Sequence, residues 1–316
     1  MATHDSIHKR WYGPEPDAWE EAPQHQLRIG GIGVRIVGDL RKSVPFEPTH
    51  EPFRVGLGHF DVSVKVEWVD RFSRLPGNPI FDSGTTWRLF DNESHFQFEF
   101  CAPIRGGKPY KRLIIDRDFR CASLQIRRAH FAAFPEAADP LGYPLDELLI
   151  MHRLTQERAI ELHGCGIVRA DGIGNLFVGH SGAGKSTTTR LWTEREDVEV
   201  LSDDRIIVRR DESAAPYGLR MYGTPWHGEA HYASPGSAPL ARIFILEHGF
   251  GNILTRLGPS AAVAELFARS FVPFHRHEYV ESALSFLQDL VSRIPVYRFS
   301  FQPDARAVET ILHLYD

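Results

Sequence analysis

The feature that most constrains this chain is a glycine-rich loop at residues 179–187, which read Gly-His-Ser-Gly-Ala-Gly-Lys-Ser-Thr. The loop satisfies the pattern G-x-x-x-x-G-K-S/T, which is specific only between a strand and a helix. An apolar run at 175–178 predicts the strand, and residues 185–192 predict the helix. A phosphate-binding loop therefore fits this segment better than the alternative, a glycine-rich turn that only caps a helix.

The loop composition indicates how it would hold phosphate. Gly182 and Gly184 permit backbone conformations that side chains would block, so successive N–H groups can turn inward around anionic oxygens at a helix N-terminus. In such loops the lysine contacts the β- and γ-phosphates and the serine hydroxyl binds Mg²⁺. The residues expected to bind the nucleotide are Gly179, His180, Ser181, Gly182, Ala183, Gly184, Lys185, Ser186 and Thr187.

A pair of carboxylates follows the loop. Asp203 lies 203 − 185 = 18 residues after Lys185, at the end of the apolar run that precedes Asp203-Asp204. One helix and one turn fill that gap, which is where a metal-binding carboxylate is expected beside a phosphate loop. Adjacent side chains at a strand end point different ways, so one can bind the metal while the other reaches an acceptor hydroxyl. The alternative is a solvated Asp-Asp turn.

Composition narrows the class of protein. A chain of 316 residues with 42% hydrophobic and 24% charged residues is typical of a soluble enzyme of about two domains. The net charge of −5 argues against nucleic-acid binding, which favours a basic excess. Three separated cysteines favour a reducing, cytoplasmic compartment. The polar N-terminus predicts no signal peptide, and no apolar run approaches the ~18 residues of a membrane span.

The patterning predicts three regions. Residues 1–26 are Pro-, His- and charge-rich and predict a flexible arm. Residues 27–128 contain short Val-, Ile-, Phe- and Trp-rich runs, which predict a β-rich domain. Residues 129–316 predict an α/β domain with strands at 160–169, 175–178, 198–201, 205–210, 242–247 and 296–301, and helices at 145–158, 185–192, within 260–293 and at 304–315.

Several of these segments together resemble a known family. His163-Gly-Cys-Gly-Ile-Val, the turn at 171–174, the phosphate loop and Leu-Ser-Asp203-Asp204 occur in the order and at the spacing of the catalytic domain of HPr kinase/phosphorylase. The resemblance covers residues 162–210. It implies a fold related to phosphoenolpyruvate carboxykinase, with the β-rich domain placed before it. The chain is similar to divergent HPr-kinase-like proteins of bacterial biosynthetic clusters, some of which look like kinases of lasso-peptide precursors.

The resemblance also implies roles for individual residues. Lys185 and Ser186 would bind phosphate and Mg²⁺, Asp203 would be the general base, and Asp204 would support the metal. His163 would line the acceptor side, although the residue by itself favours a buried, hydrogen-bonded strand histidine without a catalytic role. ATP and Mg²⁺ are the implied cofactors, and a homo-oligomer is the implied assembly.

A second loop, at 222–229, concentrates turn formers, an aromatic ring, an imidazole and a carboxylate. Such loops often carry sites, so Trp226 or His227 could contact substrate and Glu229 could join a metal shell. An ordinary packed loop explains the same residues. Arg220 could neutralise transferring phosphate, or form a surface salt bridge.

The sequence therefore predicts an ATP- and Mg²⁺-dependent kinase of a hydroxyl group, most simply a serine of a peptide or small protein. Two alternatives remain open. One is a kinase of a small molecule such as a sugar or amino acid. The other is a nucleotide-binding sensor without catalysis, against which the intact Asp203-Asp204 pair speaks.

Overall fold

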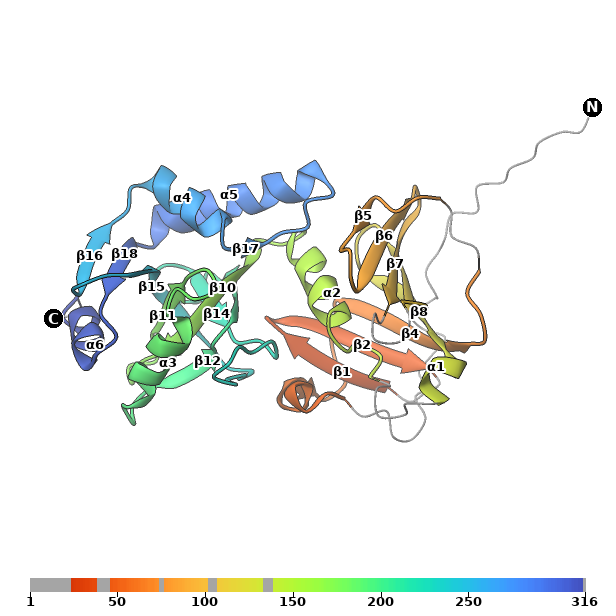
Figure 1. Cartoon of the computed structure of the whole chain (residues 1–316), viewed down its shortest axis with the longest axis horizontal. Helices are drawn as coiled ribbons and strands as arrows, with labels where there is room; N and C mark the ends of the chain where they lie inside the picture. The colour runs from red at the N-terminus through yellow and green to blue at the C-terminus, as the bar shows by residue number, and fades with distance from the viewer. Residues whose placement is uncertain (1–23, 39–45, 74–76, 102–106, 133–138, 315–316) are drawn as a thin grey trace, which may run out of the picture. The chain divides into compact units, whose positions relative to one another are not determined.

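The computed structural model describes residues 24–38, 46–73, 77–101, 107–132 and 139–314, which form two compact units (Figure 1). The second unit begins at Tyr143 and also includes residues 28–32 and 48–54. The predicted boundary after residue 128 therefore lies too early. The predicted arm at 1–26 lies outside the described residues up to 23, and its last residues belong to a strand that begins at Gln24.

The N-terminal unit is built on a nine-stranded sheet in the order β3-β1-β2-β4-β9-β8-β7-β6-β5. The pairs β2–β4 and β4–β9 are parallel, and the pairs from β9 through β8, β7 and β6 to β5 are antiparallel. The elements between residues 24 and 132, of which η2 belongs to the second unit, are β1 (Gln24–Ile29), β2 (Ile32–Gly38), η2 (Pro48–Phe53), β3 (Arg54–Val55), β4 (Val62–Val69), β5 (Phe81–Asp82), β6 (Trp87–Asn92), β7 (His95–Cys101), β8 (Pro109–Asp116), β9 (Cys121–Arg127) and α1 (Arg128–Ala132).

Strand β7 is buried on both faces, which explains its aromatic run. Phe96 and Phe98 pack on Phe119, with ring centroids 5.7 and 6.1 Å away. The charged pair Arg112–Glu99 is also buried, with nitrogen and oxygen 3.0 Å apart. The guanidinium additionally donates to a backbone carbonyl, which compensates part of the cost of burying it.

The C-terminal unit contains the phosphate loop. Its elements are α2 (Leu145–Leu154), β10 (Ala159–Val168), β11 (Gly174–Val178), α3 (Lys185–Thr193), β12 (Glu199–Ser202), β13 (Arg205–Arg210), β14 (Leu219–Tyr222), β15 (Ser237–His248), β16 (Ile253–Arg256), α4 (Pro259–Phe267), β17 (Ser270–Phe271), α5 (His277–Arg293), β18 (Val296–Phe301) and α6 (Ala305–Leu312). The sequence did not predict β14, β16 and β17. These strands have two to four residues, too few for a period-two pattern.

Five strands of this unit close into a ring. β10 pairs with β13 through residues 159–163 and with β11 through residues 164–168. β15 pairs with β14 and then in parallel with β11, which completes the circuit β11-β10-β13-β14-β15. Gly164 lies where β10 changes partner, and a Cβ atom there would come within 2.7 Å of the Phe177 carbonyl oxygen. Glycine therefore permits the close approach of the two strands.

Helices pack on the ring from two sides (Figure 1). α4 and α5 cover one apolar cluster, to which they contribute Leu266, Phe286 and Leu290. α3 and α6 cover a second cluster that contains the fully buried Trp192 and a row of stacked phenylalanines. The amphipathic pattern of residues 281–293 thus reflects core packing, as its helical spacing predicted.

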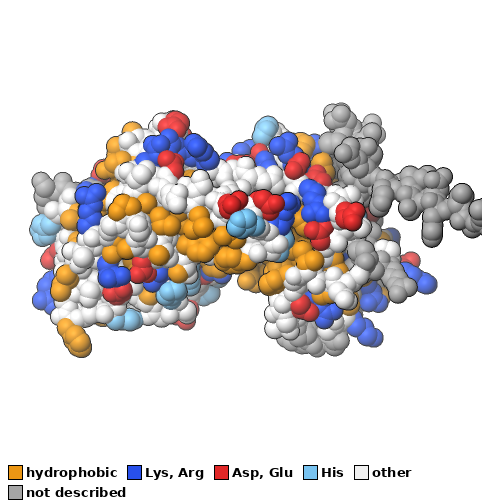
Figure 2. Space-filling view, turned by 90° about the horizontal axis from the view of Figure 1, so that it is seen from above, with side chains coloured by type: hydrophobic (Ala, Val, Ile, Leu, Met, Phe, Trp, Pro, Cys, Tyr) orange, Lys and Arg blue, Asp and Glu red, His pale blue; other side chains and the backbone are white. Residues whose placement is uncertain are grey.

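Charged side chains of both signs are interspersed over the described part of the face seen in Figure 2. Among the described residues, no helix combines the length and apolar character needed to cross a bilayer.

Candidate active site at the phosphate loop

The phosphate loop connects β11 to α3. Gly182 and Gly184 have φ values of +81° and +102°, in the left-handed region that glycine adopts without strain. Gly184 is the N-cap of α3, and a Cβ atom there would lie 2.7 Å from the Phe301 ring. Both glycines are therefore required for the path of the loop, the second also for its close approach to β18.

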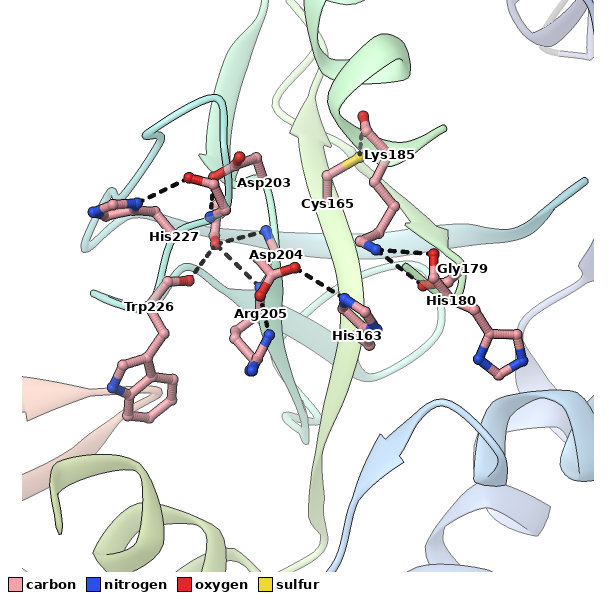
Figure 3. A network of polar contacts seen from close by, with 12 residues as sticks. His163, Cys165, Gly179, His180, Lys185, Asp203, Asp204, Arg205, Trp226 and His227 are labelled. Atoms are coloured by element: carbon pink, nitrogen blue, oxygen red, sulfur yellow. Dashed lines mark hydrogen bonds and ion pairs between the residues drawn. The ribbon is translucent and has the colours of Figure 1, made fainter. Parts of the chain in front are cut away.

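Lys185 is buried at the centre of the loop. Its Nζ donates hydrogen bonds to the carbonyl oxygens of Gly179 at 3.1 Å and His180 at 3.2 Å (Figure 3). Burial lowers the pKa of Lys185, although the negative charge of Asp204 opposes that shift. An ammonium group that is desolvated and held by only neutral acceptors is well suited to gain an anionic partner such as phosphate.

His163 and Asp204 form a pair beside the loop. The Nε2 atom of His163 lies 2.9 Å from Asp204 Oδ1, and the two side chains are 21% and 23% exposed (Figure 3). Burial opposes ionisation of Asp204, but the hydrogen bond from His163 and the positive charge of Arg205 outweigh it and lower its pKa. Asp204 is therefore an ionised, partly accessible carboxylate in contact with an imidazole.

The backbone connects this pair to the phosphate loop. The amide of Gly179 donates to the carbonyl of His163 at 3.1 Å, and the amide of Gly164 donates to the carbonyl of Asp204 at 3.0 Å. The first residue of the loop, the histidine and the carboxylate are thus tied together by main-chain contacts. Their relative geometry does not depend on flexible side chains alone.

Asp203, expected to be the general base, has a different environment. It is only 1% exposed. Its Oδ1 accepts from the amides of Gly228 at 2.9 Å and Tyr232 at 3.2 Å, and its Oδ2 accepts from the amide of Ala230 at 2.8 Å. These contacts fold the loop at 228–232 around the carboxylate. Of the two carboxylates, Asp204 is therefore the one that is accessible from outside the protein.

Sequence reasoning missed a buried acidic group behind the pair. Arg205 forms an ion pair with Asp204, donates to Glu147 Oε1 at 2.7 Å and lies 3.6 Å from Glu161 Oε1. Glu161 is completely buried, and among the described residues neither of its oxygens has a hydrogen-bond partner. Burial and then the charge of Glu147 raise its pKa well above the ordinary value. The signal was the alternation in β10, which puts Glu161 and His163 on one face.

The residues of the loop at 222–229 differ in their exposure and contacts. Trp226 is buried, and its indole Nε1 donates to Asp146 at 2.5 Å. The Nδ1 atom of His227 lies 3.0 Å from the Gly228 carbonyl oxygen, and the ring packs on another histidine. Glu229 is exposed and is not part of the His163–Asp204 contact.

Arg220 also lies away from the pair. It forms a 2.6 Å ion pair with Asp211, at the opposite end of β13 from Arg205. The structure thus shows the salt bridge that the sequence offered as the alternative role of Arg220.

A divalent cation fits this site only when it is bound together with phosphate. Among the described residues no three His, Cys, Asp or Glu side chains gather in a metal-binding group. Mg²⁺ commonly uses one or two protein ligands together with phosphate oxygens and water. The half-buried Ser186 at the start of α3 and the ionised Asp204 are oxygen donors of that kind. The donor set therefore suits a phosphate-bound Mg²⁺.

No protein-family model matches this chain, and no curated protein matches it significantly.

Proposed function

We propose that this protein is an ATP- and Mg²⁺-dependent kinase that phosphorylates a hydroxyl group, a serine of a peptide or small protein. The observation that carries the proposal is the contact between two features: a glycine-rich loop with a buried lysine, and a His163–Asp204 pair tied to its first residue. A site that only stores nucleotide does not need a proton acceptor beside the loop.

Different residues of the chain bind the phosphates and accept the proton. Lys185 exchanges its carbonyl partners for phosphate oxygens and offsets the negative charge that builds on the transferred group. The acceptor hydroxyl is oriented by Asp204, which takes its proton, while His163 holds the carboxylate in place. Ser186 would hold Mg²⁺ together with the phosphate oxygens, and the ion would neutralise part of the phosphate charge.

Asp203 has a positioning role in this proposal. Its three backbone contacts hold residues 228–232 behind Asp204, and the Ser202 hydroxyl accepts from the amide of Asp204 at 3.3 Å. The serine acceptor is inferred from the resemblance of residues 162–210 to HPr kinase, which phosphorylates a serine hydroxyl.

The experiment is transfer of label from γ-labelled ATP with Mg²⁺ to a panel of serine-ended peptides, HPr, sugars and amino acids. Label on a peptide or protein supports the proposal. Label only on a small molecule contradicts the acceptor class. Tight ATP binding without transfer to any acceptor contradicts catalysis and favours a sensor.

Variants of the adjacent carboxylates assign the roles. Asp204→Asn is expected to reduce turnover by at least about 10²-fold, the usual contribution of a general base, while the protein still binds ATP. Asp197→Asn is the matched control, because Asp197 pairs with Arg195 on the surface. Full activity of Asp204→Asn would contradict the mechanism.

A further inference from the structure

We propose that the nucleobase stacks on the turn between β15 and β16, at His248 and Phe250. This inference rests on the proposed function, since it concerns the remainder of a nucleotide whose phosphates occupy the loop at 179–187. None of the site residues predicted from the sequence lies in this turn.

Topology brings the turn to the loop. β11 runs parallel to β15, with Val178 paired to Ile245, and β15 runs parallel to β18, with His248 paired to Phe301. The carboxyl ends of these three strands therefore meet at one edge of the sheet. Ligands of open α/β sheets bind outside such carboxyl ends.

The two flanks of the loop differ in chemistry. On the β10 flank lie His163 and Asp204 with the neighbouring Arg205, all charged or titratable groups. On the β15 and β18 flank lie the aromatic rings of His248 and Phe301, stacked at 6.5 Å between centroids. The γ-phosphate belongs on the charged flank, where it meets the acceptor. The nucleoside is left to extend over the aromatic flank.

A direct hydrogen bond connects the turn to the phosphate loop. His248 Nε2 lies 2.6 Å from the carbonyl oxygen of Gly182. Since a carbonyl only accepts, Nε2 carries the hydrogen and donates. The bond holds one loop carbonyl toward the turn and away from the phosphates. It also fixes the distance between the turn and the phosphate loop.

The turn itself is anchored to the end of β18. The amide of Gly249 donates to the carbonyl of Phe301 at 3.2 Å, and the amide of Gln302 donates to the side-chain oxygen of Asn252 at 3.0 Å. These bonds fix the backbone of the turn, so little backbone entropy is lost when a flat ring binds there.

Phe250 provides that surface. It is fully exposed at 108%, and it makes no ring contact with any described residue. Ile253, the first residue of β16, is 61% exposed. Phe250 lies two residues after His248, whose side chain bonds the phosphate loop, and an exposed aromatic ring can stack on a nucleobase. Stacking of this kind strengthens binding roughly 5- to 150-fold per base.

The test compares two probes, Mg²⁺-ATP and inorganic tripolyphosphate, by titration calorimetry on the full chain. Tripolyphosphate occupies the loop but has no base. Phe250→Ala should weaken ATP about tenfold or more and leave tripolyphosphate unchanged, whereas Phe250→Tyr keeps the ring and should keep ATP affinity. Phe274→Ala is the matched control, because Phe274 is 65% exposed and packs on Phe267 in α4.

The outcomes separate the two proposals. Unchanged ATP affinity in Phe250→Ala, or equal weakening of ATP and tripolyphosphate, overturns the nucleobase platform and leaves the phosphate site standing. A wild-type protein that binds neither probe overturns the phosphate site and the platform with it.

Discussion

The buried imidazole of His152 should make the C-terminal unit sensitive to acid. His152 lies in α2 with no exposed surface, and its Nδ1 lies 2.6 Å from the Leu148 carbonyl oxygen, so Nδ1 carries the hydrogen. Burial, and then the nearby His275, lower its pKa from 6.5 to about 3. The unfolded chain therefore takes up a proton below pH 6.5, whereas the folded chain does not take it up until about pH 3.

The direction and the magnitude of this pH dependence follow from the difference in proton uptake between the folded and unfolded states. Because the unfolded state binds the extra proton, the free energy of unfolding falls by about 1.36 kcal/mol for each pH unit below 6.5. At pH 5 the expected loss is about 2 kcal/mol relative to pH 7.5, and the loss ends near pH 3 at about 5 kcal/mol. The value at pH 5 depends little on the folded pKa, since that pKa lies well below 5.

His152→Asn removes the titration and keeps a donor for the Leu148 carbonyl. The variant should be less stable at pH 7.5, because it leaves a cavity, but its loss between pH 7.5 and 5 should be about 2 kcal/mol smaller than that of the wild type. The assay is urea unfolding, followed by hydrogen-exchange protection of α2. His277→Asn is the control, because His277 is 81% exposed. Equal acid losses in wild type and His152→Asn would refute the reasoning.

Three further changes probe the site. Asp203→Asn should cost about 1–3 kcal/mol of stability, because an amide nitrogen would face a backbone N–H; a thermal shift that matches Asp204→Asn would contradict the buried role. Glu161→Gln should stabilise the protein more at pH 8 than at pH 5 in urea titrations, because a buried acid with a raised pKa weakens the fold as pH rises. An equal change in the free energy of unfolding at the two pH values would contradict this. Gly184→Ala should abolish ATP binding in calorimetry, because the new Cβ would contact the Phe301 ring and because alanine is strained at a φ of +102°. Retained affinity would show that the loop can move.

Local features of the site could be predicted from sequence. The expected strand at 175–178 and helix at 185–192 correspond to β11 (Gly174–Val178) and α3 (Lys185–Thr193), because the apolar run and the glycines act on adjacent residues. The strand expected at 205–210 has the same bounds as β13.

The roles within the acidic pair could not be predicted in the same way. Adjacency established that Asp203 and Asp204 point apart, but not which of them is buried. That depends on backbone amides at 228–232, whose position is set by long-range folding. The sequence likewise left Trp226 open between a substrate contact and a packed loop, since its partner Asp146 lies 80 residues away.

Arg205 explains why the buried acid belongs to the site rather than to the core alone. The register places it opposite His163, and its guanidinium lies between Asp204 on one side and Glu147 with Glu161 on the other. A proton on Glu161 leaves two carboxylates to share one positive charge. If Glu161 ionised, a third carboxylate would compete for Arg205 in a low-dielectric environment, and the interaction that keeps Asp204 ionised would weaken. Protonation of Glu161, a group without contact to the loop, should therefore help set the basicity of Asp204.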